Sequence, residues 1–334
     1  MKTYAFELSG EHRTLPKEEA LALLEIYSAG YRVVRCPEQC LIVEAEDLDF
    51  QAMGKRLAMT HRIIEVLSIC GQDPESLSGA AGMVELPHKR YRVRARRIKD
   101  AALRADEAER EVGRSLFRRG FKADLKNPEV ELRAIITGSE IILGLEIART
   151  DRSSFEARRP HLKPFFHPGV LMPRVARALV NLSKVREKER LLDPFAGTGG
   201  ILVEACLIGV RGVGLEVQPR LARGALCNLM GLDCSILSGD AKRLPFKDVS
   251  LDAAVLDTPY GRSAKIEAKS KDHLLAESLA ELQRALKPDR RMVIVADSPI
   301  DSGVKDAGFE ILQWHTDRVH RSLTRQIFVC RKVG

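Results

Sequence analysis

The sequence lacks long hydrophobic runs. No apolar stretch among its 334 residues approaches the roughly 20 residues needed to span a bilayer. Residues 1–10 carry charged and polar side chains and no apolar signal-peptide segment. These absences argue against a membrane protein, and they predict a cytoplasmic location.

Cysteine is also scarce and irregularly spaced. The seven cysteines form no Cys-x-x-Cys pair, which argues against a disulfide framework. Cys36 and Cys40 lie close together, but no second pair or nearby histidine completes a zinc site. We therefore predict that the chain holds no metal.

Charged residues, by contrast, are numerous, and their net charge is unevenly distributed along the chain. Hydrophobic residues make up 45% and charged residues 30%, which is typical of a globular protein with room for two domains. The formal net charge is +8, with 54 Lys and Arg against 46 Asp and Glu. Residues 1–150 hold 24 of each sign, so residues 151–334 hold 54 − 24 = 30 basic and 46 − 24 = 22 acidic side chains.

One basic stretch, residues 88–99, lies inside the balanced half. If it forms a strand, alternate residues project to one face, namely Arg90, Arg92, Arg94 and Arg96. Such a row could bind successive RNA phosphates. It could equally be a solvated sheet face, partly neutralised by acids such as Glu107, Glu109 and Glu111. The stretch alone does not decide between these interpretations.

The first 150 residues predict a small α/β domain. Strand patterns occupy residues 3–8, 31–35 and 39–44, with a helix expected over 17–28. A charged helix is expected over 103–119, followed by two apolar strands over 130–137 and 141–148. We expect this domain to end near residue 150.

Residues 151–169 form a proline-rich break. Pro160, Pro164 and Pro168 exclude a regular helix or central strand between them. A plain linker would explain the prolines. However, His161, His167 and two adjacent phenylalanines favour a segment that folds back over a ligand pocket.

Residues 170–334 alternate between strand and helix patterns. Strands are expected over 190–192, 212–215, 234–237, 253–256 and 292–296, with helices over 173–182, 199–207, 219–229 and 274–286, the last stopped by Pro288. Residues 309–313 and 326–330 would add an antiparallel pair. The alternation predicts an α/β fold with a Rossmann-like, doubly wound sheet that binds ligands at the carboxyl ends of its strands.

Acids follow four consecutive predicted strands. They are Asp193, Glu216, Asp240 and Asp257. Helix capping explains one or two acids at such positions but hardly four in order. Glu216 lies where a ribose-binding acid is expected, and Asp240 could accept a hydrogen bond from the amine of an adenine. We therefore predict an adenosine-containing cofactor.

The glycine-rich turn after the first of these strands discriminates between cofactors. Its acid, Asp193, precedes Gly197 and Gly199 and would repel the pyrophosphate of NAD, which remains the rival. The same acid suits the positive charge of S-adenosylmethionine, which we favour. The predicted cofactor-binding residues are Asp193, Phe195, Ala196, Gly197, Gly199, Glu216, Asp240, Ala241 and His167.

The fourth strand ends in Asp257-Thr258-Pro259-Tyr260. The carboxylate and the Thr258 carbonyl can each accept an N–H of a conjugated amino group, while Tyr260 offers a ring on which a flipped-out base stacks. A proline turn with a capping aspartate is the simpler alternative. We favour the catalytic interpretation, with Asp257, Pro259 and Tyr260 at the active site.

These motifs resemble those of a known family. Residues 193–200, residues 257–263, and the Arg-Arg-Pro-His and Phe-Phe-His-Pro-Gly segments before them are similar to those of the archaeal tRNA guanine-10 N2-methyltransferases. The resemblance implies S-adenosylmethionine, a tRNA substrate, mono- then dimethylation of guanosine 10, and an N-terminal ferredoxin-like piece with a THUMP RNA-binding domain. Arg262 then joins the arginine row as a candidate RNA contact.

The chain departs from the family at one position, where Thr258 replaces the usual proline of Asp-Pro-Pro-Tyr. Two alternatives stay open. One is a methyltransferase for another amino group, in DNA adenine, ribosomal RNA guanine or protein glutamine; the other is a tRNA-binding protein without activity. The need for a small activator protein and the oligomeric state are also open.

Overall fold

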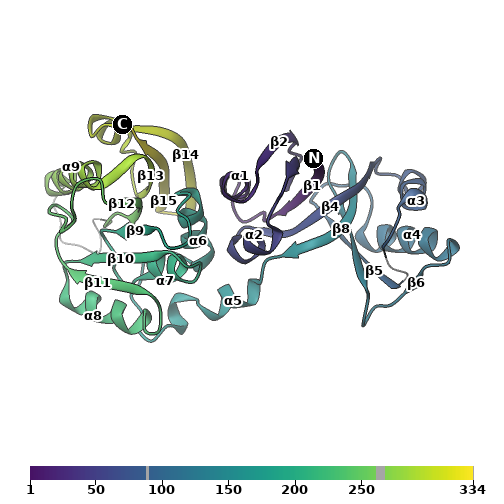
Figure 1. The fold of residues 1–334 in the computed structure, drawn as a ribbon, viewed down its shortest axis with the longest axis horizontal. Helices are drawn as coiled ribbons and strands as arrows, with labels where there is room; N and C mark the ends of the chain where they lie inside the picture. Colours follow the sequence, from purple (N-terminus) through teal and green to yellow (C-terminus); the bar gives the residue numbers. More distant parts are fainter. Residues whose placement is uncertain (88–89, 261–267, 334) are drawn as a thin grey trace. The chain divides into compact units, whose positions relative to one another are not determined.

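The chain divides into two compact units, residues 1–150 and residues 151–334. A computed structural model describes residues 1–87, 90–260 and 268–333, and Figure 1 shows their secondary structure. Each unit is built on its own sheet.

Unit 1 contains a single eight-stranded sheet. The strands are β1 (Lys2–Leu8), β2 (Gly30–Arg35), β3 (Cys40–Glu46), β4 (Thr60–Cys70), β5 (Arg90–Arg97), β6 (Lys122–Ala123), β7 (Val130–Ile136) and β8 (Ile141–Arg149). Their order is β2-β3-β1-β4-β8-β7-β5-β6. The two expected pieces of this unit therefore share one sheet, because β8 pairs with β4 on one side and β7 on the other.

Four helices cover one face of this sheet. They are α1 (Leu15–Tyr27), α2 (Phe50–Arg56), α3 (Pro74–Met83) and α4 (Ala105–Arg118). Asp49 and Asp73 cap α2 and α3 by accepting backbone N–H groups. Two hydrophobic clusters lie under the helices, one around Phe6 and Leu41 and the other around Tyr91 and Leu132.

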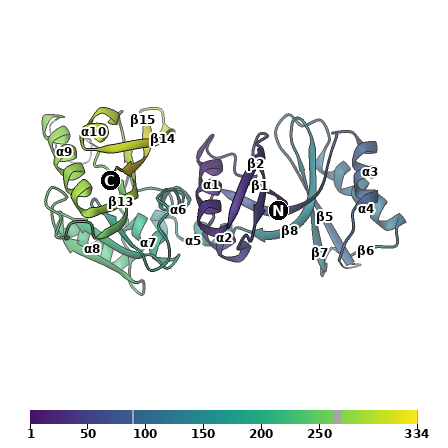
Figure 2. The ribbon, with the colours of Figure 1, turned by 45° about the horizontal axis from the view of Figure 1, so that its top comes forward.

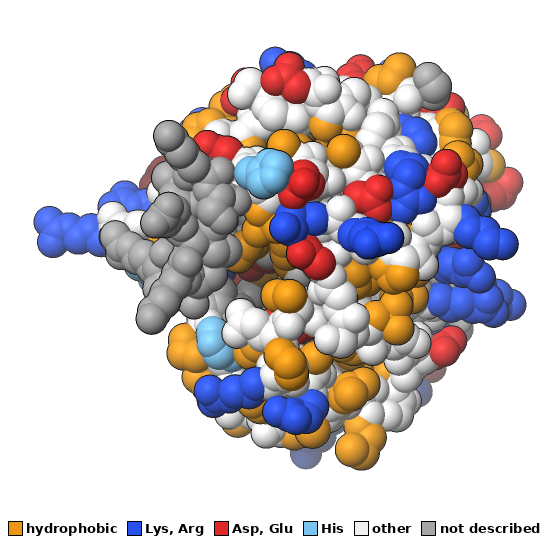
Figure 3. Space-filling view, turned by 90° about the vertical axis from the view of Figure 1, so that its left-hand side faces the viewer, with side chains coloured by type: hydrophobic (Ala, Val, Ile, Leu, Met, Phe, Trp, Pro, Cys, Tyr) orange, Lys and Arg blue, Asp and Glu red, His pale blue; other side chains and the backbone are white. Residues whose placement is uncertain are grey.

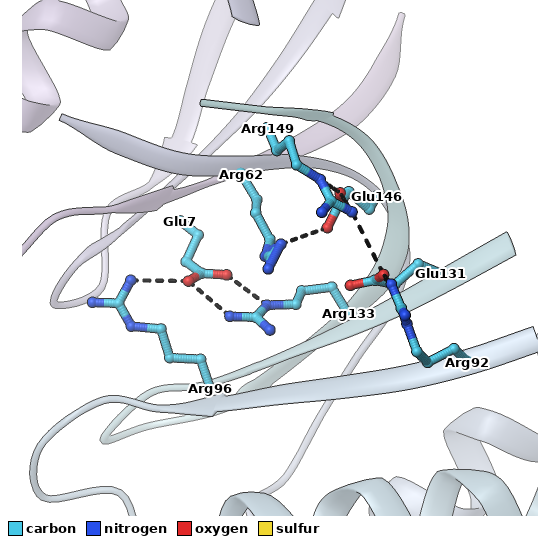
Figure 4. Close-up of polar contacts among 8 residues, drawn as sticks. All are labelled: Glu7, Arg62, Arg92, Arg96, Glu131, Arg133, Glu146 and Arg149. Atoms are coloured by element: carbon cyan, nitrogen blue, oxygen red, sulfur yellow. Dashed lines mark hydrogen bonds and ion pairs between the residues drawn. The ribbon is translucent and has the colours of Figure 1, made fainter. Parts of the chain in front are cut away.

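The opposite face of the sheet carries a network of ion pairs, drawn in Figure 4. Glu7, which is 1% exposed, accepts hydrogen bonds from Arg96 at 2.9 Å and from Arg133 at 2.6 and 2.9 Å. Beside this trio, Arg62, Arg92 and Arg149 pair with Glu131 and Glu146. Five arginines thus surround three glutamates on neighbouring strands.

Unit 2 contains a seven-stranded sheet. Its strands are β9 (Arg190–Asp193), β10 (Arg211–Glu216), β11 (Cys234–Ser238), β12 (Leu251–Asp257), β13 (Leu286–Ala296), β14 (Phe309–His320) and β15 (Leu323–Lys332), in the order β11-β10-β9-β12-β13-β15-β14. Strands β9 to β13 are parallel, and β14 and β15 form an antiparallel hairpin next to β13. The predicted doubly wound sheet is confirmed.

Helices flank this sheet (Figure 2): α6 (Pro173–Leu182), α7 (Gly200–Cys206), α8 (Pro219–Asn228), α9 (Ala268–Ala285) and α10 (Asp301–Asp306). The short helix α5 (Arg152–Ala157) packs against α6. Leu282 of α9 and Val304 of α10 belong to one hydrophobic core together with Leu256 of β12 and Ile294 of β13. This packing holds the carboxyl ends of the parallel strands in place.

Two predictions about unit 2 are corrected. Pro288 does not stop α9, which already ends at Ala285; it lies inside β13, where the register with β12 shifts and Asp289 has φ of 59°. A proline is tolerated in a strand at such an irregularity. Cys206 and Cys234 form a disulfide that the cysteine spacing did not predict, whereas the other five cysteines are free.

No helix in the described residues has the length and apolar character needed to cross a membrane.

Candidate active site

The four predicted acids meet at one edge of the unit 2 sheet. Their strands, β11, β10, β9 and β12, are consecutive neighbours. All four acids line a cavity of about 270 Å³. Of the other predicted cofactor and catalytic residues, the cavity is also lined by His167, Phe195, Ala196, Gly197, Ala241, Pro259 and Tyr260.

The glycine-rich turn forms the floor between β9 and β10. Gly197 and Gly199 have φ of 52° and 77°, a left-handed conformation that favours glycine. Gly199, also predicted to bind the cofactor, is the N-cap of α7 and lies between two residues that line the cavity, Thr198 and Gly200. Glu216 fixes the turn by accepting the N–H of Gly197 at 2.9 Å and that of Gln218 at 2.8 Å.

Asp193 is a buried acid with no cationic partner among the residues that the structure describes. It is 1% exposed and accepts the backbone N–H of Phe195 at 3.1 Å. Burial raises its pKa well above the ordinary value, and the negative charges of Asp257 and Glu216 add to the effect. Within the described ranges no basic side chain forms an ion pair with it. The cavity therefore favours a positively charged group next to Asp193.

Asp257 lies at the end of β12 and belongs to a short chain of hydrogen bonds. The Tyr260 hydroxyl donates to Asp257, and the Nε of Arg325 donates to that hydroxyl at 3.1 Å. Burial raises the pKa of Asp257 to about 6, although the Tyr260 hydrogen bond and the Arg325 charge act in the opposite direction. Burial and the Asp257 charge also raise the pKa of Tyr260. Asp257 is thus an acid whose charge changes close to neutral pH.

Thr258 attaches this loop to the neighbouring strand. Its N–H and its hydroxyl both donate to the carbonyl of Val295 in β13, each at 2.9 Å. A proline at this position could make neither hydrogen bond. The residue that departs from the usual motif therefore restrains the loop by different means.

The proline-rich segment reaches the same cavity. Residues 167–171 line it. The Asn228 side chain of α8 accepts the N–H of Phe165 at 3.0 Å and donates to its carbonyl at 2.9 Å, and it also donates to the Thr198 carbonyl. A Cβ on Gly224 would come within 2.1 Å of the Phe165 ring, so glycine is needed for this approach. Asn228 therefore joins the segment to the glycine-rich turn.

The predicted arginine row lies in unit 1, on β5. Tyr91 and Val93 are buried, as the alternation predicts. Each arginine has an acidic partner within the unit: Arg90 with Glu129, Arg92 with Glu131, Arg94 with Glu109 and Arg96 with Glu7. The structure thus favours the neutralised sheet face over a free row of cations, although most of the acids are not those considered from the sequence. Arg262 lies outside the described residues.

Two polar residues of the site were missed from the sequence, Asn228 and Arg325. Arg325 lies on β15, more than 60 positions after Tyr260, and no local motif marks it. On the face of unit 2 seen in Figure 3, basic, acidic and hydrophobic side chains are interspersed. Among the described side chains on that face, no broad surface of one charge therefore indicates where a substrate would bind.

Comparison with known proteins agrees with this geometry. Residues 160–327 match the model of the UPF0020 family, described as an RMKL-like methyltransferase domain. A curated relative from Methanothermobacter thermautotrophicus, named tRNA (guanine(10)-N2)-dimethyltransferase, is 34% identical over 98% of each chain. A relative of the same name from Methanocaldococcus jannaschii is 29% identical over 98% of this chain and 99% of its own.

Solved structures support the fold. TrmN from Thermus thermophilus aligns with a TM-score of 0.58 at 24% identity, covering 99% of this chain and 100% of its own. SMU.472, a putative methyltransferase complexed with SAH, aligns with a TM-score of 0.56 at 14% identity over 100% and 99% of the two chains.

The sheet and the family match define a methyltransferase with a Rossmann-like domain. Within that class, the chain belongs to the family of the archaeal tRNA (guanine(10)-N2)-dimethyltransferases, as its motifs predicted.

Proposed function

We propose that the protein methylates the exocyclic N2 of guanosine 10 in tRNA, first once and then twice, with S-adenosylmethionine as the methyl donor. The observation that carries this proposal is that two acids, Asp193, which is buried, and Asp257, which is partly buried, line one cavity. Asp193 and Asp257 end neighbouring strands, β9 and β12, and each has a raised pKa. One suits a cationic donor and the other an amino acceptor.

The residues present fit the proposed cofactor. A sulfonium or ammonium group next to Asp193 would compensate a buried carboxylate that has no cation in the described residues. Glu216 ends β10, where it would accept ribose hydroxyls. Asp240, which pairs with Lys242 at 3.6 Å, would accept a hydrogen bond from the adenine amine. When bound, S-adenosylmethionine supplies an electrophilic methyl group.

The chemistry of this chain's own residues is mainly positioning. The lone pair of a guanine amino group is delocalised into the ring, so it is a weak nucleophile. One oxygen of Asp257 accepts the Tyr260 hydroxyl, and the other would accept one amino N–H while the Thr258 carbonyl accepts the second. The nitrogen would gain the methyl group and lose a proton to Asp257 or water. Pro259 would fix the loop, and the Tyr260 ring would stack on the base.

Unit 1 would bind the tRNA as a THUMP-type domain, and such a substrate would place the enzyme in the cytoplasm. Because the four arginines of the predicted row on β5 have acidic partners, they would contribute less to phosphate binding than their number suggests. Dependence on a small activator protein is a separate question, which assays with purified protein alone would answer.

The deciding experiment incubates purified protein with unmodified tRNA transcripts and radiolabelled S-adenosylmethionine. The product is mapped by nuclease digestion and mass spectrometry. N2-methylguanosine and its dimethylated form at position 10 are expected. Label at another base would preserve the chemistry and overturn the substrate assignment. Absence of label despite cofactor binding would overturn the proposal for the isolated chain and direct the search to other acceptors or a missing partner.

A further inference from the structure

The hairpin of β14 and β15 extends past its neighbour at the edge where the active site lies. The last residue of β13, Ala296, pairs with Gln326 of β15. Beyond that pair the hairpin continues with Asp317 opposite Arg325, Arg318 opposite Thr324 and His320 opposite Leu323. Residues 317–325 therefore project beyond the carboxyl ends of the parallel strands, and we call them the hairpin tip.

Hydrogen bonds place the base of the hairpin tip against the active site. Arg325 donates to the Tyr260 hydroxyl at 3.1 Å and to the carbonyl of Gly169, a cavity-lining residue, at 3.4 Å. Arg325 is 5% exposed, so this junction is part of the folded structure. Arg325, at one end of the hairpin tip, is thus hydrogen-bonded to Tyr260, the residue on which we propose that the target base stacks.

The hairpin tip is positively charged. It contains three arginines, Arg318, Arg321 and Arg325, and one acid, Asp317, which pairs with Arg325 at 3.8 Å. The net charge of residues 317–325, counting Arg and Asp only, is therefore 3 − 1 = +2. Because Asp317 pairs with Arg325, this charge lies on Arg318 and Arg321, which are both exposed. Across the ranges that the structure describes, neither of them has an ion pair. The four arginines of the predicted row on β5, by contrast, all have acidic partners.

An RNA substrate makes cations at this place useful. Four acids line the cavity, and they would repel the phosphates that accompany a base entering it. A flipped-out nucleotide keeps its two flanking phosphates near the mouth of the pocket. Arginines beside that mouth would attract the backbone and offset the repulsion.

We propose that Arg318 and Arg321 of the hairpin tip bind the RNA phosphates that flank the target nucleotide. This inference rests on the proposed function for its choice of substrate. His320 lies between the two arginines, and its Nδ1 is within 3.3 Å of the Ser322 N–H that donates to it. In the neutral ring the proton is then on Nε2, where it is a third donor for a phosphate oxygen.

The test compares two double variants of the full-length protein. Arg318→Gln with Arg321→Gln removes the charges of the hairpin tip. The matched control, Arg290→Gln with Arg331→Gln, removes two arginines from the opposite end of β13 and β15, where they pair with Glu189 and Glu310. Binding of a tRNA transcript is measured against salt concentration, with cofactor binding by calorimetry to verify folding.

We expect the tip variant to bind tRNA about tenfold more weakly at low salt, and the slope of log K against log salt to fall by about 1.4 to 1.8, as two lost phosphate contacts require. The control should keep the affinity and slope of the unaltered protein. Unchanged binding by the tip variant, or an equal loss in both variants, would overturn the inference. The single variants Arg318→Gln and Arg321→Gln are measured in the same way. A lost phosphate contact weakens tRNA binding and leaves cofactor binding unchanged, whereas a folding defect weakens both.

A second readout locates the contact. An iron chelate attached to Ser322→Cys, in the turn of the hairpin tip, should cleave the tRNA next to the target nucleotide; protein without this cysteine, treated identically, controls for Cys36 and Cys227. Cleavage only elsewhere would overturn the inference. Methyl transfer by the unaltered protein is scored separately, so a failed substrate assignment and a failed role for the hairpin tip give different patterns.

Discussion

Buried acids have opposite surroundings in the two units. In unit 1, Glu7 is enclosed by two arginines, and although burial alone would raise its pKa, the hydrogen bonds and charges of Arg133 and Arg96 hold it below the usual range. In unit 2, Asp193 is as deeply buried and Asp257 is partly buried, but the pKa values of both are raised. An acid whose charge is balanced by the protein stabilises the fold, whereas one whose charge is left for a ligand costs stability until the ligand binds.

The largest effect is expected for substitution of Asp257, the acid proposed to act in catalysis. Asp257→Asn keeps the size of the side chain but removes the proton acceptor, so kcat should fall by about 10²- to 10⁴-fold. Rates from the tRNA assay, together with calorimetric affinity for the cofactor, measure the effect. Cofactor affinity should change little. If kcat were retained, Asp257 would be a turn-capping residue only.

Removing the acid from the balanced cluster should instead affect stability. Glu7→Gln leaves Arg133, whose side chain is 9% exposed, with an uncompensated charge, so unfolding of unit 1 should become easier by about 3–5 kcal/mol. Urea unfolding followed by circular dichroism measures this. Glu310→Gln, which breaks an exposed pair with Arg331, is the control and should cost less than about 1 kcal/mol. Equal costs would remove the contrast between the units.

The pH dependence of stability should have opposite signs at the two acids. Because the pKa of Asp257 rises on folding from 3.8 to about 6, the protonated acid contributes stability below pH 4, and this is lost as pH rises through 6. Asp257→Asn should therefore raise stability by up to about 3 kcal/mol at pH 7.5 and change it little at pH 4. For Glu7 the lowered pKa gives stability that is present above pH 4.5 and lost as pH falls. Thermal unfolding at both pH values distinguishes the signs.

A smaller effect should come from Arg325, which acts on Asp257 through Tyr260 and through its charge. Removing that charge in Arg325→Gln should raise the pKa of Asp257, shift the acidic limb of kcat to higher pH, and lower kcat at pH 6.5 by about three- to tenfold. Among the described residues, Asp193 and Asp297 also act on this acid, while Lys271 pairs with Asp297 and Asp317 pairs with Arg325. Arg331→Gln on the same strand should leave the limb in place. A limb that does not move in Arg325→Gln would reduce this arginine to a structural role.

Much of the fold was predictable from local patterns, and the parts that were not have physical reasons. Helix α6 and strands β9 to β12 match their predicted positions within a few residues, because each has apolar periodicity and a marked end. Strand β4 was missed because two register shifts, near Ile63 and Val66, interrupt its alternation. Helix α3 was missed although Asp73 and Pro74 carry a helix-start signal, since its glycines weaken the helical pattern.

The residues of the active site also fall into those that the sequence predicts and those that it does not. Asp193, Glu216, Asp240 and Asp257 were found because strand ends are visible in a sequence. Asn228 and Arg325 were not, because their partners, Phe165 and Tyr260, are more than 60 positions away along the chain. Contacts of that range depend on which strands become neighbours, and no local pattern records it.

The position of β8 in the unit 1 sheet has a consequence for synthesis on the ribosome. It is the last strand of the unit to be made, yet it lies in the interior of the sheet between β4 and β7. Until residues 141–149 emerge, both of those strands present an open edge that can pair wrongly with another nascent chain. The unit can therefore close only after its final strand is translated.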